Sequence, residues 1–172
     1  MRIGVSAAMF LATSILIAGL SAGTAGQPPA KKSPAGKGFP NLVKDLKATP
    51  GCLGVEVART ESGKQVIFAW FENKKAVLEW VEGDAHQKLM SYGFPGQTFE
   101  KPLKDIPEDS GPILAIASIT YAEKPKFKES TLPISQIAIE LYQPMKGGVA
   151  LGGTFAPAKL KVPGLRDYTG KK

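Results

Sequence analysis

The chain has 172 residues, a formal net charge of +7, one cysteine and one histidine. This length is sufficient for one globular domain. The single cysteine excludes an internal disulfide framework, and one histidine without a neighbouring cysteine excludes a zinc site. The lysines are dispersed along the sequence, so the positive charge indicates no particular patch for an acidic polymer or a membrane surface.

Residues 1–25 are expected to form a signal peptide. Arg2 precedes an uncharged, largely apolar run at residues 3–20, and small residues follow at 21–26, which is typical of a secretory leader. An uncleaved membrane anchor is the alternative, although polar and glycine residues dilute a run that is already marginal for crossing the hydrocarbon. We expect cleavage after Ala25, with cleavage after Ala22 or Gly26 as alternatives, a periplasmic or secreted location, and no stable membrane insertion afterwards.

Residues 26–40 are rich in proline, glycine and lysine, a composition that predicts a flexible tether. A single folded domain is expected at residues 41–157, followed by a polar, lysine-bearing tail at 158–172.

The folded domain begins with a predicted helix that Asn41 can cap. The helix is expected to end at residues 49–51, Thr-Pro-Gly, because proline disfavours a helical conformation in the preceding residue. A strand follows at residues 53–58, in which Leu53, Val55 and Val57 are expected to share one face. Residues 61–64 are expected to form the hairpin connection to a second strand at 65–71.

This second strand is apolar on both faces, which predicts a place inside a covered sheet. Asn73 can cap the next helix, whose apolar residues recur at helical spacing, and Gly83-Asp84 is expected to divide that helix into two pieces. Residues 91–112 read as a long loop of the kind that often covers a functional site.

Three more strands are predicted at residues 113–121, 134–142 and 149–155. The order helix, strand, strand, helix is most of a ferredoxin-like β-α-β-β-α-β unit that lacks its first strand. We expect residues 113–121 to fill the vacant position or the one beside it. The predicted fold class is therefore α+β, ferredoxin-like, with a permuted or extended antiparallel sheet; a separate β-hairpin subdomain is the alternative.

Three segments resemble the antibiotic biosynthesis monooxygenase family: residues 49–56 (TPGCLGVE), residues 71–76 (FENKKA), and Trp80 followed by residues 83–86 (GDAH). The resemblance spans residues 42–90 and implies a dimeric α+β barrel, hence a homodimer. It also implies a cofactor-independent monooxygenase acting on a small aromatic or quinol-like substrate. The family's haem-degrading branch is disfavoured, because Met90 stands where that branch has its haem-ligating histidine.

Under this resemblance His86 is the candidate catalytic residue, acting as a general base, and Trp80, Trp70 and Phe68 are candidate pocket-lining residues. The alternatives are a partly exposed histidine at a helix end and aromatic residues that only pack in the core. Phosphate-binding, dinucleotide-binding and single-stranded nucleic-acid patterns are missing, so we expect no cofactor, metal or nucleic-acid partner. The alternative function is a non-catalytic exported domain that binds a small hydrophobic ligand or serves as a dimeric module.

Overall fold

The structure is a computed structural model that describes residues 42–170, all of which belong to one compact unit. The elements in chain order are α1 (Leu42–Ala48), β1 (Cys52–Arg59), β2 (Gln65–Phe71), α2 (Lys74–Glu82), α3 (Asp84–Gly93), β3 (Ile113–Tyr121), β4 (Ile134–Tyr142), β5 (Val149–Ala150) and β6 (Arg166–Asp167). The expected signal peptide and tether lie outside the described residues, as does the capping residue Asn41.

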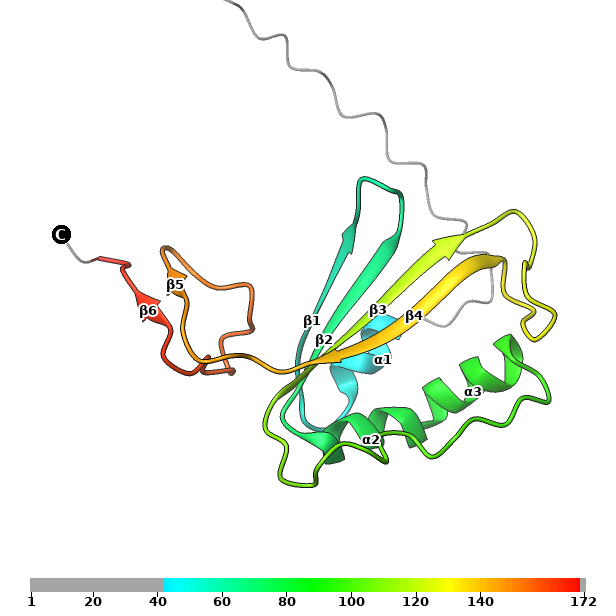
Figure 1. Ribbon diagram of the computed structural model, residues 1–172, viewed down its shortest axis with the longest axis horizontal. Coiled ribbons are helices and arrows are strands. Elements are labelled where there is room, and N and C mark those ends of the chain that lie inside the picture. Colours follow the sequence, from blue (N-terminus) through cyan, green and yellow to red (C-terminus); the bar gives the residue numbers. More distant parts are fainter. Residues whose placement is uncertain (1–41, 171–172) are drawn as a thin grey trace, which may run out of the picture. The chain divides into compact units, whose positions relative to one another are not determined.

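Strands β1 to β4 form one antiparallel sheet in the order β1-β2-β3-β4 (Figure 1). β2 lies between β1 and β3 and is largely buried on both faces, as its doubly apolar sequence predicts. In a β-α-β-β-α-β unit the first strand pairs with the third. β3 pairs with β2 in that place, so the expected permuted completion of an α+β sheet is confirmed.

A β-bulge interrupts the start of β1. Cys52 pairs with Phe71 and Gly54 pairs with Trp70, so Leu53 is an extra residue in this strand. Leu53 consequently packs beside Trp70, whereas Val55 belongs to the core on the other face. The prediction that Leu53 shares a face with Val55 and Val57 is wrong, because strict alternation does not hold through a bulge.

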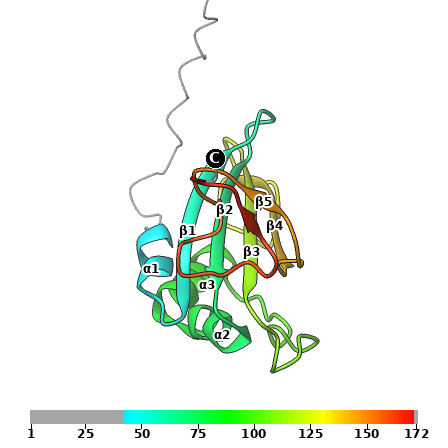
Figure 2. The same ribbon diagram turned by 90° about the vertical axis from the view of Figure 1, so that its left-hand side faces the viewer.

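The helices cover one face of the sheet (Figures 1 and 2). The Asn73 side chain accepts a hydrogen bond from Ala76 N (3.0 Å), and Gly83 both ends α2 and begins α3, so the predicted cap and the division into two helices are confirmed. The core between helices and sheet is made of Leu46, Val55, Ile67, Ala69, Phe71, Ala76, Val77 and Ile113.

The C-terminal end of α3 is fixed to the connection between β3 and β4. The Ser130 hydroxyl and the Thr131 backbone N–H both donate to Gly93 O, at 2.8 and 2.9 Å. Leu132 from this connection packs with Ile119 and with Leu89 of α3. These bonds satisfy the Gly93 carbonyl, one of those that a helix end leaves without partners, so α3 has a defined end on the sheet.

The opposite face of the sheet is partly covered by the C-terminal segment of the chain (Figure 2). Ala156 and Leu160 pack on Trp70, and the ring of Phe155 meets Phe68 edge to face at 5.0 Å. Leu160 is buried although it lies in the stretch expected to be a polar tail. The expected last strand is also shorter than predicted: only Val149–Ala150 is a strand, and it pairs in parallel with β6.

Within residues 42–170, no helix is both long enough and apolar enough to cross a bilayer.

Candidate functional site

His86 lies in the first turn of α3, close to where α2 ends. Its Nδ1 lies 2.8 Å from Val81 O, and Gln87 Nε2 donates to the same carbonyl at 2.7 Å. Because Val81 O can only accept, Nδ1 carries the proton and Nε2 keeps a lone pair. Burial lowers the pKa of His86 below its ordinary value, an effect that the Val81 bond opposes. His86 is therefore a neutral imidazole at neutral pH and can accept a proton at Nε2.

The four predicted site residues do not meet at one place. Trp80 lies on the helix side of the sheet, where its ring contacts that of His86 at 5.5 Å between centroids. Phe68 and Trp70 point from β2 to the opposite face, toward the C-terminal segment. Alternate residues of a strand point to opposite faces. A single cavity lined by Trp80, Trp70 and Phe68 is therefore not formed, because the sheet separates them.

A pocket of about 540 Å³ lies on the helix side, between the long loop and the strands β3 and β4. Its volume falls in the range of about 300–1,000 Å³ that is usual for small-molecule sites. The lining residues combine apolar and polar side chains and come from the loop, the start of β3 and the end of β4: Ile106, Pro107, Asp109, Ser110, Gly111, Ile113, Leu141, Tyr142 and Gln143. His86 is not among them.

Ser110 contributes a buried polar group that lacks a hydrogen-bond partner. Its Oγ is buried and makes no hydrogen bond within the described chain. A buried hydroxyl without a partner costs about 1–3 kcal/mol. Because Oγ has almost no exposed area, a bound molecule would satisfy it only after the Ser110 side chain rotates toward the pocket.

Lys74 fixes the loop that forms this pocket. It is the first residue of α2, it is buried, and its Nζ donates to Ile106 O (2.7 Å) and to the Glu108 carboxylate (2.6 Å). The loop is thus held to the start of α2 by one buried ammonium group. Because Ile106 also lines the pocket, the Lys74 bond sets the position of one pocket wall.

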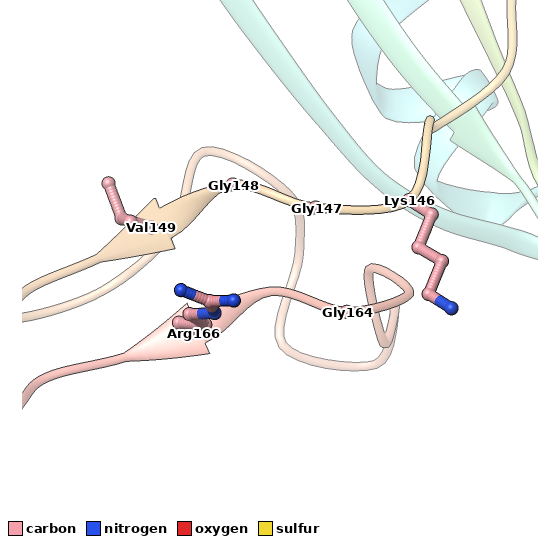
Figure 3. A pocket seen from close by; sticks show the side chains of 6 residues that line it. All are labelled: Lys146, Gly147, Gly148, Val149, Gly164 and Arg166. Atoms are coloured by element: carbon pink, nitrogen blue, oxygen red, sulfur yellow. The ribbon is translucent and has the colours of Figure 1, made fainter.

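A second hollow, of about 520 Å³, lies in the C-terminal segment between β5 and the turn before β6 (Figure 3). It is lined by Lys146, Val149 and Arg166 with three glycines, Gly147, Gly148 and Gly164. Figure 3 shows Lys146 and Arg166 at opposite ends of this hollow, with the glycines between them. His86 does not line it either. Among the described residues, no three histidine, cysteine, aspartate or glutamate side chains are grouped to hold a metal ion.

Cys52 also lies outside both hollows and packs against the helix-side core. Burial raises the pKa of its thiol, only partly offset by a bond to Gly54 O and by the charge of Lys47. Cys52 is therefore a protonated packing residue and a poor nucleophile.

The sequence indicated His86 and the long loop, and it missed Ser110 and Lys74. Residues 91–112 have no hydrophobic periodicity, so nothing in the sequence marks which loop residue faces inward. Lys74 follows a capping asparagine, where lysine ordinarily faces solvent.

Residues 29–92 match the model of the antibiotic biosynthesis monooxygenase family. The match confirms the family resemblance and reaches thirteen residues beyond α1 toward the N-terminus, into the stretch expected to be a tether. Neither the curated proteins nor the solved structures give a significant match.

Proposed function

We propose that this chain, which matches the antibiotic biosynthesis monooxygenase family at residues 29–92, binds a small, mostly apolar molecule in the pocket beneath the long loop. The observation that supports this proposal most directly is the buried Ser110 Oγ without a partner. Binding sites of this kind combine apolar walls with a few polar groups that orient the ligand. Ile113 and Leu141 would supply the apolar walls, and Ser110 the orienting group.

A Ser110→Ala variant tests this proposal by separating stability from binding. Removing the unpaired hydroxyl should raise the free energy of unfolding by about 1 kcal/mol, because nothing within the protein satisfies that group. The same change should weaken the binding of hydroquinones and naphthols by about threefold to tenfold, since their hydroxyl groups would lose a partner. Urea unfolding and NMR titration of the methyl groups of Ile113 and Leu141 measure the two effects.

Ser135→Ala is the matched control, because Ser135 is an exposed serine outside the pocket. It should leave binding unchanged. A wild-type titration in which no compound of the panel shifts the Ile113 or Leu141 signals would reject the pocket as a site for this ligand class.

A second candidate function is a cofactor-independent monooxygenase, supported by the family match and by the neutral imidazole of His86. Its site would lie at the junction of α2 and α3, outside both hollows. The neutral imidazole could take a proton from a hydroquinone hydroxyl at Nε2, which would leave an electron-rich anion that reacts with dioxygen. One oxygen atom would form a bond to a ring carbon and the other would leave as water, with the electrons and hydrogens supplied by the hydroquinone as it becomes a hydroxyquinone. In this function Trp80 would flank the substrate, since its ring lies against His86.

Oxygen uptake with a panel of hydroquinones tests the catalytic function. His86→Ala should lower the rate by about a hundredfold or more, the usual contribution of a general base. Gln87→Ala should retain the rate within a few-fold, because Gln87 shares the Val81 carbonyl but offers no base. Equal rates for the wild type and His86→Ala would exclude His86 as the base.

The proposal includes export of the mature domain, on the basis of Arg2, the uncharged run at residues 3–20 and the small residues after it. Expression with the native N-terminus, followed by mass spectrometry of the exported fraction, should give a chain that begins at Gly26. Recovery of the full-length chain from the membrane fraction would favour the anchor instead.

A further inference from the structure

The C-terminal segment exposes an unusual amount of apolar surface. Residues 145–155, named here the C-terminal apolar loop, contain the three most exposed large hydrophobic side chains of residues 42–170: Met145, Leu151 and Val149, at 86, 79 and 74%. Phe155 adds a fourth at 58%. Scattered exposed apolar residues are ordinary, but several in one short segment indicate a surface that meets another apolar surface.

This loop is held in a defined conformation. Its base is fastened by three backbone hydrogen bonds: Gly147 N to Pro163 O, Arg166 N to Gly148 O, and Tyr168 N to Ala150 O, at 2.8, 3.1 and 2.9 Å. Its far end is fixed where Ala156 packs on Trp70. The apolar side chains are therefore presented by a segment tied at both ends, which lowers the entropy lost on binding.

The charges around the loop are positive. Residues 143–170 contain Lys146, Lys159, Lys161 and Arg166 against the single acidic residue Asp167, a formal net charge of +3 (four minus one). Lys146 and Arg166 stand at the two ends of the glycine-lined hollow, and Val149 of the apolar loop lines the same hollow (Figure 3). Cationic and apolar groups thus occur together in one small region.

We propose that the C-terminal apolar loop binds the surface of an anionic lipid bilayer. Its apolar side chains enter the boundary between headgroups and acyl chains, and Lys146 and Arg166 pair with lipid phosphates beside the hollow. A second copy of this chain is a poorer occupant, because its own loop carries the same positive charge. Binding of this kind is peripheral and requires no membrane-spanning segment.

Co-sedimentation with vesicles tests this proposal, using phosphatidylcholine alone or phosphatidylcholine mixed with phosphatidylglycerol. The exported protein should sediment with the mixed vesicles and much less with phosphatidylcholine alone, and raising the salt concentration should release it. The double variant Met145→Ser, Leu151→Ser should partition at least about tenfold more weakly. The double variant Lys146→Gln, Arg166→Gln should lose most of its preference for the anionic lipid.

Matched controls separate this region from general surface effects. Ile139→Ser removes another exposed apolar side chain from β4, and the double variant Lys101→Gln, Lys128→Gln removes two exposed lysines elsewhere. Both should bind like the wild type. Because a retained leader would itself bind vesicles, all variants are compared in one preparation whose N-terminus is identified by mass spectrometry.

Two outcomes would overturn the proposal. One is equal sedimentation of the wild type and the Met145→Ser, Leu151→Ser variant. The other is full release by millimolar inorganic phosphate at constant ionic strength, which would show that an anion site in the hollow holds the protein and that the apolar loop does not enter the bilayer.

Discussion

His86 illustrates how one residue can be fixed by packing and still keep a chemical capacity. Its ring lies against Trp80, and its Nδ1–H donates to Val81 O, so the tautomer is set by a carbonyl of the preceding helix. The same burial that holds the ring lowers the pKa of the imidazole. A structural role and a role as a base therefore require the same contacts, and only measurements of activity separate them.

The lowered pKa of His86 predicts how stability depends on pH. The unfolded chain takes up its proton near pH 6.5, whereas folded His86 takes it up only at a lower pH. As the pH falls through 6.5, the unfolded state therefore binds more protons and the free energy of unfolding decreases. His86→Gln should flatten this decrease between pH 6.5 and the folded pKa. Urea unfolding at a series of pH values measures it, and parallel curves for both proteins would contradict the prediction.

The glycines at two turns separate two reasons why a side chain is disfavoured: the backbone conformation and a steric clash with a neighbouring residue. Gly51 and Gly63 both have a positive φ, 75° and 84°, which disfavours a side chain. A Cβ on Gly51 would lie 2.5 Å from the Ala76 Cβ, at the point where β1 begins against α2, whereas a Cβ on Gly63 would meet nothing within 4 Å. The first turn is therefore closed against a helix and the second is open.

Substituting alanine for each glycine separates the cost of the positive φ from the cost of the steric clash. Gly63→Ala should lower the free energy of unfolding by about 1 kcal/mol, the cost of the left-handed conformation alone. Gly51→Ala should cost at least about 2 kcal/mol more, because the backbone must also move away from Ala76. Chemical denaturation of both variants gives the difference. Equal losses would show that α2 yields to the added methyl group without cost.

The attachment of the long loop to α2 gives a third prediction. Lys74→Met removes the donor to Ile106 O and should lower the free energy of unfolding by about 1.5–3 kcal/mol, the usual value for a hydrogen bond to a charged group. Glu108→Gln should cost less than about 0.5 kcal/mol, because that carboxylate is 83% exposed and its ion pair is screened by water. Urea unfolding compares the two.

Hydrogen exchange at the amides of residues 103–112 should rise in Lys74→Met and stay unchanged in Glu108→Gln. A loss of stability without faster exchange there would mean that Lys74 supports the core and does not hold the loop.

Much of the sheet could be predicted from the sequence, because β2 and β3 are apolar on both faces and β4 alternates. The two-piece helix was also predictable from Gly83. The bulge was not, because Leu53, Val55 and Val57 alternate in the sequence as they would in a regular strand. Nor was the burial of Leu160, a single leucine between Lys159 and Lys161, which only the nearby Trp70 surface explains.

The candidate site was less predictable than the fold. The Gly-Asp-Ala-His segment indicated the helix junction that carries His86, since glycine and aspartate there begin a new helix. The pocket depends on which residues of an aperiodic loop line it, and Lys74 holds that loop at Ile106, four residues before Ser110. That relation joins residues more than thirty positions apart, and local sequence patterns do not encode it.

At the scale of the whole molecule, the homodimer implied by the family resemblance stays a prediction. Light scattering coupled to size exclusion should give twice the mass of one mature chain, with dissociation on dilution following mass action. A single-chain mass at every concentration would contradict it. The C-terminal segment, packed on the Trp70 face, would then be what covers this side of the sheet in place of a partner.

The bulge at the start of β1 determines how this protein tolerates the deletion or insertion of one residue in that strand. Because Leu53 is the extra residue, its deletion would leave Cys52 and Gly54 in regular alternation. Every later pairing of β1 would stay in register. The helix-side core would persist, while the C-terminal segment would lose one of the side chains on which it packs. Gaining a codon within residues 55–58 would instead turn the core side chains of β1 outward. A deletion at this one position should therefore preserve the sheet and weaken, without removing, the packing of its C-terminal cover.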